Sequence, residues 1–246
     1  MRYLILSDIH SNWEALEAVL EDARGAYDSV VCCGDLVGYG ADPNRVTEWA
    51  RARLAAVVRG NHDKASVGLE DLEWFNPVAR AAALWTEQNL TVENLSYLRA
   101  LPKGPVPVES FQILHGSPLD EDDYLMSALA ALDLAPYLEV NLSFFGHTHI
   151  QGAFVLEEHA VDWIEKPDAD PGRVEIEIKE GPRYLINSGS VGQPRDNDPR
   201  AGYALYAPEQ RQVELRRVRY PVEIAQAKIR RAGLPQVLAE RLGWGS

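Results

Sequence analysis

Near the start of the sequence stands Tyr3-Leu4-Ile5-Leu6-Ser7-Asp8-Ile9-His10, an apolar run followed by a serine, an aspartate and a histidine. Four further apolar runs end in comparable polar groups, which are Gly34-Asp35, Gly60-Asn61-His62-Asp63, His115-Gly116 and Gly146-His147-Thr148-His149. Short runs rich in β-branched and aromatic residues are typical of strands that are buried on both faces. The sequence therefore predicts five buried strands that each lead into a polar loop.

Helical spacing of apolar residues separates the early runs, and this alternation predicts an α/β fold. Strands are expected at 3–6, 29–32, 55–58, 111–114 and 142–145, and helices after Ser11, from Pro43, over 77–88 and over 91–99. Ser11 is expected to cap the first helix, with Glu14 three residues on completing a capping box.

From about residue 153, apolar residues recur at every second position instead of at helical spacing, which predicts a β-rich second half. Strands are expected at 161–164, 174–178, 184–186, 203–206 and 213–218. The stretch Lys166–Gly172 is interpreted as a hairpin turn. The basic segment 211–231 is interpreted as a solvated edge strand and helix, with a polyanion-binding patch as the alternative. Residues 1–246 are expected to form one domain that closes with a helical tail at 221–246.

Composition excludes several classes of protein. The 246 residues include 46% hydrophobic ones, enough for a packed core, and carry a net charge of −13, which disfavours binding to long nucleic acids. No apolar stretch is long enough to span a bilayer, and the first apolar run ends too early for a signal peptide. The two cysteines, Cys32 and Cys33, are neighbours and form no disulfide framework. These features predict a cytoplasmic protein that does not bind membranes.

The polar loops contain five of the six histidines in the chain, and only His159, which is expected to be exposed, lies elsewhere. Loops after the carboxyl ends of strands in an α/β sheet converge on one crevice, so we expect these side chains to meet. Imidazoles mixed with carboxylates and an amide suit Mn, Fe, Zn, Co or Ni. The ligands are too many for one ion. Two ions that share a carboxylate are suited to in-line displacement at phosphorus, so phosphoester hydrolysis is predicted.

Together, and in this order, the five motifs resemble the signature of the calcineurin-like metallophosphoesterase superfamily: Asp8-x-His10, Gly34-Asp35, Gly60-Asn61-His62-Asp63, His115 and Gly146-His147-x-His149. The stretch 187–196, Asn-Ser-Gly-Ser-Val-Gly-Gln-Pro-Arg-Asp, resembles the closing loop of the small prokaryotic phosphodiesterase-like branch, although Ser188 stands where a proline is common. The resemblance extends to about Tyr206. It implies two facing mixed β-sheets flanked by helices, a four-layer αββα sandwich.

The resemblance also implies a role for each site residue. Asp8, His10 and His149 would bind one divalent ion, Asn61, His115 and His147 would bind the other, and Asp35 would bridge the two. Mn, Fe or Zn would fill these positions, with Ni or Co as alternatives. A metal-bridging hydroxide would attack phosphorus, and His62 would stabilise the developing charge and protonate the leaving oxygen.

Two positions depart from the Ser/Thr protein phosphatases of the superfamily. Those enzymes carry an Asp and an Arg where this chain has Gly38 and Tyr39, which argues against protein phosphatase activity and leaves the group that orients His62 open. Arg195 is a candidate phosphate ligand, with a surface salt bridge as the alternative. Residues 120–123 are interpreted as a solvated acidic turn, or as a cleft rim that repels highly anionic substrates. Trp74 and Phe75 are interpreted as packing residues rather than as a base-stacking platform.

The leading hypothesis is an enzyme that hydrolyses phosphomono- or phosphodiesters of small molecules or nucleotides, including dinucleoside polyphosphates. The alternative is a catalytically weak metal-binding scaffold or regulatory module of the same fold. Retention of His62 favours the enzyme, because such scaffold members commonly lose this histidine. A nuclease is the third hypothesis, and the negative charge argues against it.

Overall fold

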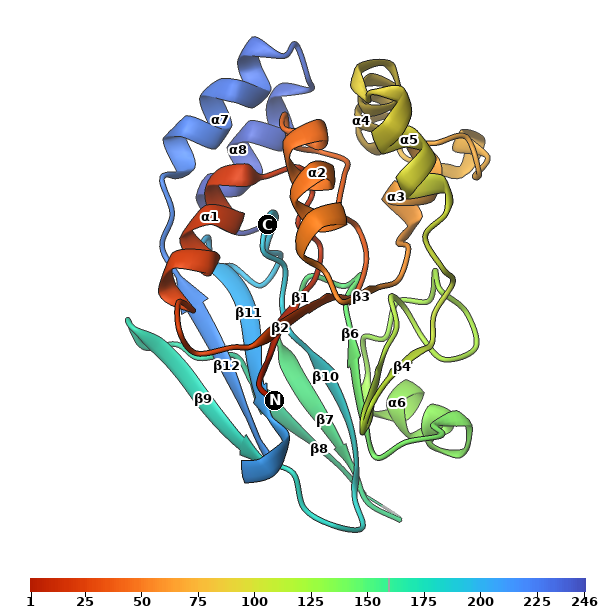
Figure 1. Cartoon of the computed structure of the whole chain (residues 1–246), viewed down its shortest axis with the longest axis vertical. Coiled ribbons are helices and arrows are strands. Elements are labelled where there is room, and N and C mark those ends of the chain that lie inside the picture. The colour runs from red at the N-terminus through yellow and green to blue at the C-terminus, as the bar shows by residue number, and fades with distance from the viewer. Residues whose placement is uncertain (159) are drawn as a thin grey trace.

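The computed structural model describes residues 1–158 and 160–246, with the backbone but not the side chain of Trp74. His159, expected to be exposed, lies outside the described residues. Two six-stranded mixed sheets form the centre of the molecule (Figure 1). In the described residues, no helix has the length and apolar character needed to cross a membrane.

The first sheet has the strand order β3-β2-β1-β11-β12-β9. Its strands are β1 (Tyr3–Leu6), β2 (Ser29–Cys32), β3 (Ala56–Val57), β9 (Gly172–Glu177), β11 (Ala201–Ala207) and β12 (Gln212–Val218). β1, β2 and β3 are parallel, and the other pairs are antiparallel. The parallel half of this sheet delivers three of the polar loops to one edge.

The second sheet has the strand order β4-β5-β6-β10-β7-β8. Its strands are β4 (Val106–Val108), β5 (Phe111–Ile113), β6 (Leu142–Phe145), β7 (Gly152–Leu156), β8 (Val161–Glu165) and β10 (Arg183–Asn187). β5, β6 and β10 are parallel. The carboxyl ends of β5 and β6 deliver the other two polar loops.

Helices cover the outer faces of both sheets (Figure 1). They are α1 (Trp13–Asp22), α2 (Pro43–Arg53), α3 (Asn61–Ala65), α4 (Pro77–Asn89), α5 (Val92–Arg99), α6 (Ala128–Leu134), α7 (Val222–Arg231) and α8 (Gln236–Trp244), with 3₁₀ turns at Leu72–Trp74, Ala135–Tyr137 and Pro208–Gln210. α1, α2, α7 and α8 pack on the first sheet, and α6 packs on the second.

The core has three apolar layers, as the four-layer fold requires. In β1, Tyr3 and Ile5 lie between the sheets, while Leu4 and Leu6 face the helices. The two cysteines follow the same alternation, because Cys32 lies in the helix layer and Cys33 between the sheets. The predicted pair of facing mixed sheets flanked by helices is therefore confirmed.

Three local predictions are wrong, and they concern a helix cap, a hairpin turn and, at β12, an edge strand. Asn12, not Ser11, caps α1, because the Asn12 side chain accepts the N–H of Ala15 while the Ser11 backbone is held in a loop with φ +54°. The stretch Lys166–Gly172 is not a hairpin, because it connects β8 in the second sheet to β9 in the first.

β12 is not an edge strand, because it is paired on one side with β11 and on the other with β9. Its basic residues are accordingly not all solvated. Arg217 is buried, where it pairs with Asp196 and donates to Gln151 Oε1. Arg211 and Arg219 at the two ends of the strand, and Arg230 and Arg231 of α7, are exposed as the sequence suggested.

Candidate metal centre

The five polar loops meet where the carboxyl ends of β1, β2, β3, β5 and β6 approach each other. All seven predicted ligands come together there, and all except the half-buried Asn61 are buried: Asp8, His10, Asp35, His115, His147 and His149. The loops are joined directly, because the N–H of His147 donates to Asp8 Oδ1 at 3.1 Å. The predicted convergence of the five loops is therefore present in the structure.

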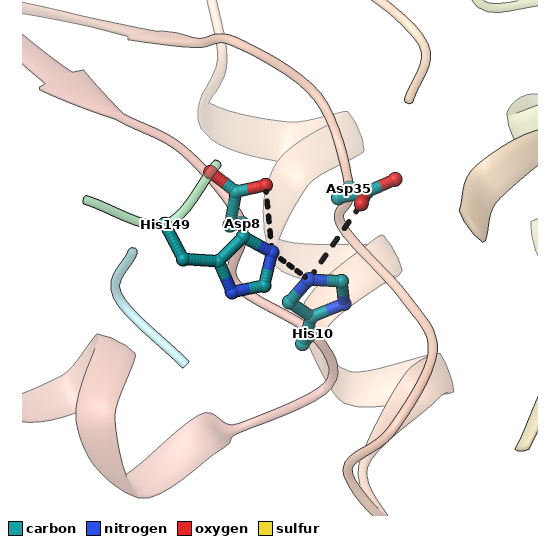
Figure 2. A group of neighbouring side chains, drawn as sticks. All are labelled: Asp8, His10, Asp35 and His149. Carbon is teal, nitrogen blue, oxygen red and sulfur yellow. Dashed lines mark hydrogen bonds and ion pairs between the residues drawn. The ribbon is translucent and has the colours of Figure 1, made fainter. Parts of the chain in front are cut away.

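One cluster consists of Asp8, His10, Asp35 and His149, whose ligand atoms all lie within 4.8 Å of one another (Figure 2). His149 Nε2 lies 3.4 Å from Asp8 Oδ1 and 3.1 Å from His10 Nε2. His10 Nε2 in turn lies 3.6 Å from Asp35 Oδ2. The four side chains therefore surround one small volume with two nitrogens and two carboxylates.

A second cluster consists of Asp35, His115 and His147. His115 Nε2 lies 3.5 Å from Asp35 Oδ2, 3.1 Å from His147 Nδ1 and 3.3 Å from the Asn61 side-chain oxygen. Asp35 belongs to both clusters through the same oxygen, Oδ2.

Backbone carbonyls fix the orientation of the four imidazoles. The Nδ1 atoms of His10, His115 and His149 lie 3.0, 2.7 and 2.6 Å from the carbonyl oxygens of Val37, Cys33 and Gln193. For His147 it is Nε2 that lies 3.0 Å from a carbonyl oxygen, that of Asp122. A nitrogen that faces a carbonyl carries the proton, so the other nitrogen presents its lone pair to the cluster.

The two clusters have the chemistry that a cation needs. Asp8 Oδ2 and Asp35 Oδ2 are buried and accept no hydrogen bond from the described residues. Burial raises the pKa of Asp8 to about 7. Burial lowers the pKa of His115, but the negative charge of Asp35, whose Oδ2 lies 3.5 Å from His115 Nε2, outweighs this effect and raises the pKa to about 10. The site thus requires positive charge beside Asp35, which a divalent cation would supply in place of a proton.

The ligand loops have an unusual backbone conformation. Asp8, His10, Asp35, His147 and His149 all have φ between +48° and +65°, a region that residues other than glycine rarely adopt. Such conformations cost about 1–3 kcal/mol each and cluster at functional sites. Five of the ten non-glycine residues with positive φ in the described chain are thus predicted ligands.

Asp63 holds two of these loops together. Its carboxylate accepts the N–H groups of Asp35 at 2.9 Å, Gly60 at 3.0 Å and Val37 at 3.2 Å. The absence of a side chain at Gly60 is required here, because a Cβ would collide with the Asp35 carboxylate. Sequence reasoning treated Asp63 only as a neighbour of His62, although its place in the first turn after Gly60 is a signal of helix capping.

The ring of His62 is positioned by packing rather than by an acidic partner. It lies 4.2 Å from the ring of Tyr39 and 5.0 Å from that of His10, between ring centroids, and 5.8 Å from that of Phe75. Its Nδ1 is buried without a hydrogen-bond partner in the described residues, and a Cβ at Gly38 would lie 2.7 Å from it. Burial lowers the pKa of His62 to about 4.

Phe75 also packs against the helix-side core, as its interpretation as a packing residue expected. The side chain of its neighbour Trp74 lies outside the described part of the chain. Tyr39 is a residue that sequence reasoning noted only as a departure. The structure places its ring directly on His62.

Arg195 lies beside this group. Its Nη2 donates to the Tyr39 hydroxyl and to Gln193 Oε1, both at 3.3 Å, and within the described residues it forms no ion pair. Its backbone N–H donates to the carbonyl oxygen of His149. The guanidinium therefore has donors left for a ligand, as a phosphate contact requires.

The acidic turn at 120–123 is neutralised in part by two basic side chains. Arg59 makes two hydrogen bonds to Glu121 at 2.8 and 2.9 Å, and Lys64 lies 3.2 Å from Glu121 and 2.6 Å from Asp122. Because the Asp122 carbonyl orients His147, these ion pairs support the candidate metal centre. Sequence reasoning missed this link, because ion-pair partners so far apart in the chain leave no local signal.

Comparison with known proteins agrees with this geometry. The family model described as calcineurin-like phosphoesterase matches residues 1–151. The uncharacterized protein MJ0912 of Methanocaldococcus jannaschii is 37% identical over 251 residues, which cover 98% of this chain and 97% of that protein.

Solved structures extend the match to the whole chain. A metallophosphoesterase from Sphaerobacter thermophilus is 40% identical and superposes with a TM-score of 0.88, over 100% of this chain and 99% of that one. The hypothetical protein PH1004 from Pyrococcus horikoshii OT3 shares the fold, with a TM-score of 0.78 at 20% identity over 100% of this chain and 98% of that one. The resemblance read from the motifs is confirmed, and this chain belongs to the calcineurin-like phosphoesterase family.

Proposed function

We propose that this protein is a dinuclear metal-dependent phosphoesterase that hydrolyses phosphomono- or phosphodiesters of small molecules or nucleotides. The observation that carries the proposal is the position of Asp35 Oδ2, 3.6 Å from His10 Nε2 in one cluster and 3.5 Å from His115 Nε2 in the other. One carboxylate oxygen shared by two ligand clusters is what a bridged pair of cations needs. The mixed nitrogen and oxygen donors suit Mn, Fe or Zn.

Each ligand has a proposed place. Asp8, His10 and His149 would hold one cation, Asn61, His115 and His147 the other, and Asp35 both. Two bound cations would supply charge neutralisation at the phosphate and a more acidic water. The carbonyl partners of the imidazoles hold each ring so that its second nitrogen faces these positions.

His62 is the proposed general acid. Its backbone N–H donates to Asp35 Oδ1 at 2.9 Å, and its ring is held against Tyr39 and His10, so it is fixed beside the metal centre. A phosphate group bound there would favour the protonated imidazole, offsetting the effect of burial on the His62 pKa. Nε2 would then donate the proton to the leaving oxygen, and Arg195 would bind a phosphate oxygen.

The test is hydrolysis of 4-nitrophenyl phosphate and bis(4-nitrophenyl) phosphate by protein loaded with Mn²⁺. Release of nitrophenol is expected, and His62→Ala is expected to lower kcat about 100-fold or more. Elemental analysis of His62→Ala should still find two ions per chain, because His62 is not a proposed ligand. The proposal fails if neither ester is cleaved, or if His62→Ala is as active as the parent protein.

A further inference from the structure

An apolar cavity of about 230 Å³ lies beside the metal centre, on the outer side of the second sheet. Leu125, Phe145, Thr148, Phe154, Met126 and Trp163 form most of its wall. The first four are at most 5% exposed, whereas Met126 is 57% and Trp163 39% exposed. The cavity is therefore a pit with a buried floor and an open, apolar rim.

The wall of this cavity is continuous with the metal centre. Thr148 is the single residue between His147 and His149, both of which are proposed ligands. Tyr124, next to Leu125 in the chain, stacks on His147 with ring centroids 3.9 Å apart. The cavity and the candidate metal centre therefore border on the same two short segments of the chain, 124–126 and 147–149.

The lining decides which chemical group fits. Among the described residues that line the cavity none is charged, and the side chains offer two polar groups, the Thr148 hydroxyl and the indole N–H of the partly exposed Trp163. The Thr148 hydroxyl oxygen already accepts hydrogen bonds from Asn187 Nδ2 at 2.9 Å and from the Ile150 N–H at 3.3 Å. A nucleobase would thus bury its polar edges with few partners, which is costly. An apolar ring has no polar atoms to leave without partners, and an apolar cavity of about 150 Å³ is enough to bind benzene.

We propose that this cavity binds the uncharged aryl or alkyl group of the substrate's alcohol while the phosphate lies at the metal centre. The inference rests on the proposed function and narrows its substrate class to phosphoesters of apolar alcohols. A small group fits the pit better than a second protein surface does, because four of the six named walls are buried at its floor.

The first test compares benzyl phosphate with ethyl phosphate, whose alcohols are of similar acidity. A single methylene in an apolar pocket is worth about tenfold or more in kcat/KM, so the ring should give a preference of at least about tenfold. Ala128→Phe would fill the cavity from α6 and abolish this preference without lowering the hydrolysis of ethyl phosphate. Leu129→Phe is the matched control, since Leu129 is 70% exposed and lies outside the lining.

Equal rates for the two esters, or a preference that survives Ala128→Phe, would overturn the inference. So would a diadenosine polyphosphate that is cleaved faster than benzyl phosphate by both the parent and Ala128→Phe.

A second measurement separates this inference from the proposed function, because it needs neither metal nor turnover. Benzyl alcohol is titrated into the protein while the indole N–H signal of Trp163, assigned with Trp163→Phe, is followed by NMR. A saturable shift that Ala128→Phe removes supports the cavity even if no ester is hydrolysed. The inference is refuted if the Trp163 signal does not shift on addition of benzyl alcohol. It is also refuted if the signal shifts only with protein concentration, as a contact between two copies of the chain would cause.

Discussion

The carboxylate of Asp63 offers the sharpest test of how the site is built, because it is not a proposed ligand. It is fully buried and accepts three backbone N–H groups, two through Oδ2 and one through Oδ1. Asp63→Ala leaves all three donors buried without this acceptor. Each such donor costs about 1–3 kcal/mol, so we expect a loss of about 3 kcal/mol or more in the free energy of unfolding.

Asp63→Asn should lower the free energy of unfolding by less than Asp63→Ala does. The amide oxygen can replace Oδ2 for the N–H groups of Asp35 and Gly60, while the amide nitrogen faces the N–H of Val37, leaving one donor without a partner. Burial raises the pKa of Asp63 to about 7, so the neutral amide also avoids the cost of burying a charge. The unpaired donor destabilises the fold and the absence of a buried charge partly offsets this, so we expect the free energy of unfolding to fall by about 1–2 kcal/mol.

The assay is urea unfolding of protein treated with a chelator, followed by tryptophan fluorescence, and Mn²⁺ binding by calorimetry. Loss of a group that orients ligands weakens metal affinity about 10- to 100-fold, and we expect this for both variants. Asp71→Asn is the control, because Asp71 is exposed and accepts a single N–H, that of Glu73. If Asp63→Asn unfolds within about 0.5 kcal/mol of the parent and binds Mn²⁺ as tightly, the reasoning is refuted.

Three further predictions concern the same region. Asp35→Asn should reduce bound metal at both positions, and elemental analysis that still finds two ions per chain would contradict the bridging role. Gly38→Ala should lower kcat with metal content unchanged, because the new Cβ would lie 2.7 Å from His62 Nδ1, whereas Gly25→Ala, with a similar positive φ and no atom nearby, should keep full activity. Burial raises the pKa of Glu121, but its two basic partners outweigh this and lower it below 4.5. The ion pairs therefore stabilise the fold above about pH 4.5 and less as the pH falls. The difference in unfolding free energy between Glu121→Gln and the parent should be about 1–3 kcal/mol at pH 7 and shrink in acid, and a gap independent of pH would contradict the assignment.

The residues of the candidate metal centre could be chosen from the sequence because each lies in a loop that follows an apolar strand. His10, Asp35 and His147 belong to three different loops and two different sheets, yet a local pattern identifies all of them. The rule that carboxyl ends of parallel strands meet at one edge then supplies the three-dimensional step. The layered fold follows from the same strands, since runs buried on both faces require a covering layer on each side.

The groups that orient the ligands could not be predicted, because most of them are backbone carbonyls. The carbonyl oxygens of Val37, Cys33, Gln193 and Asp122 hold the four imidazoles, and any residue type supplies the same atom. The sheet to which a strand belongs is also missing from a local pattern. For this reason the period-two segments on either side of Lys166–Gly172 suggested a hairpin, although they lie in different sheets.

The strained ligand loops and the buried carboxylates have a common consequence for stability. Asp8 and Asp35 are buried side by side, and both belong to loops with positive φ, so the site without a cation stores unfavourable conformational and electrostatic energy. A cation that binds these carboxylates only in the folded state offsets that energy, and its binding free energy becomes folding free energy. Asp63 and the carbonyl partners keep the loops in place until it binds. Metal occupancy and the stability of this edge of the two sheets are therefore coupled.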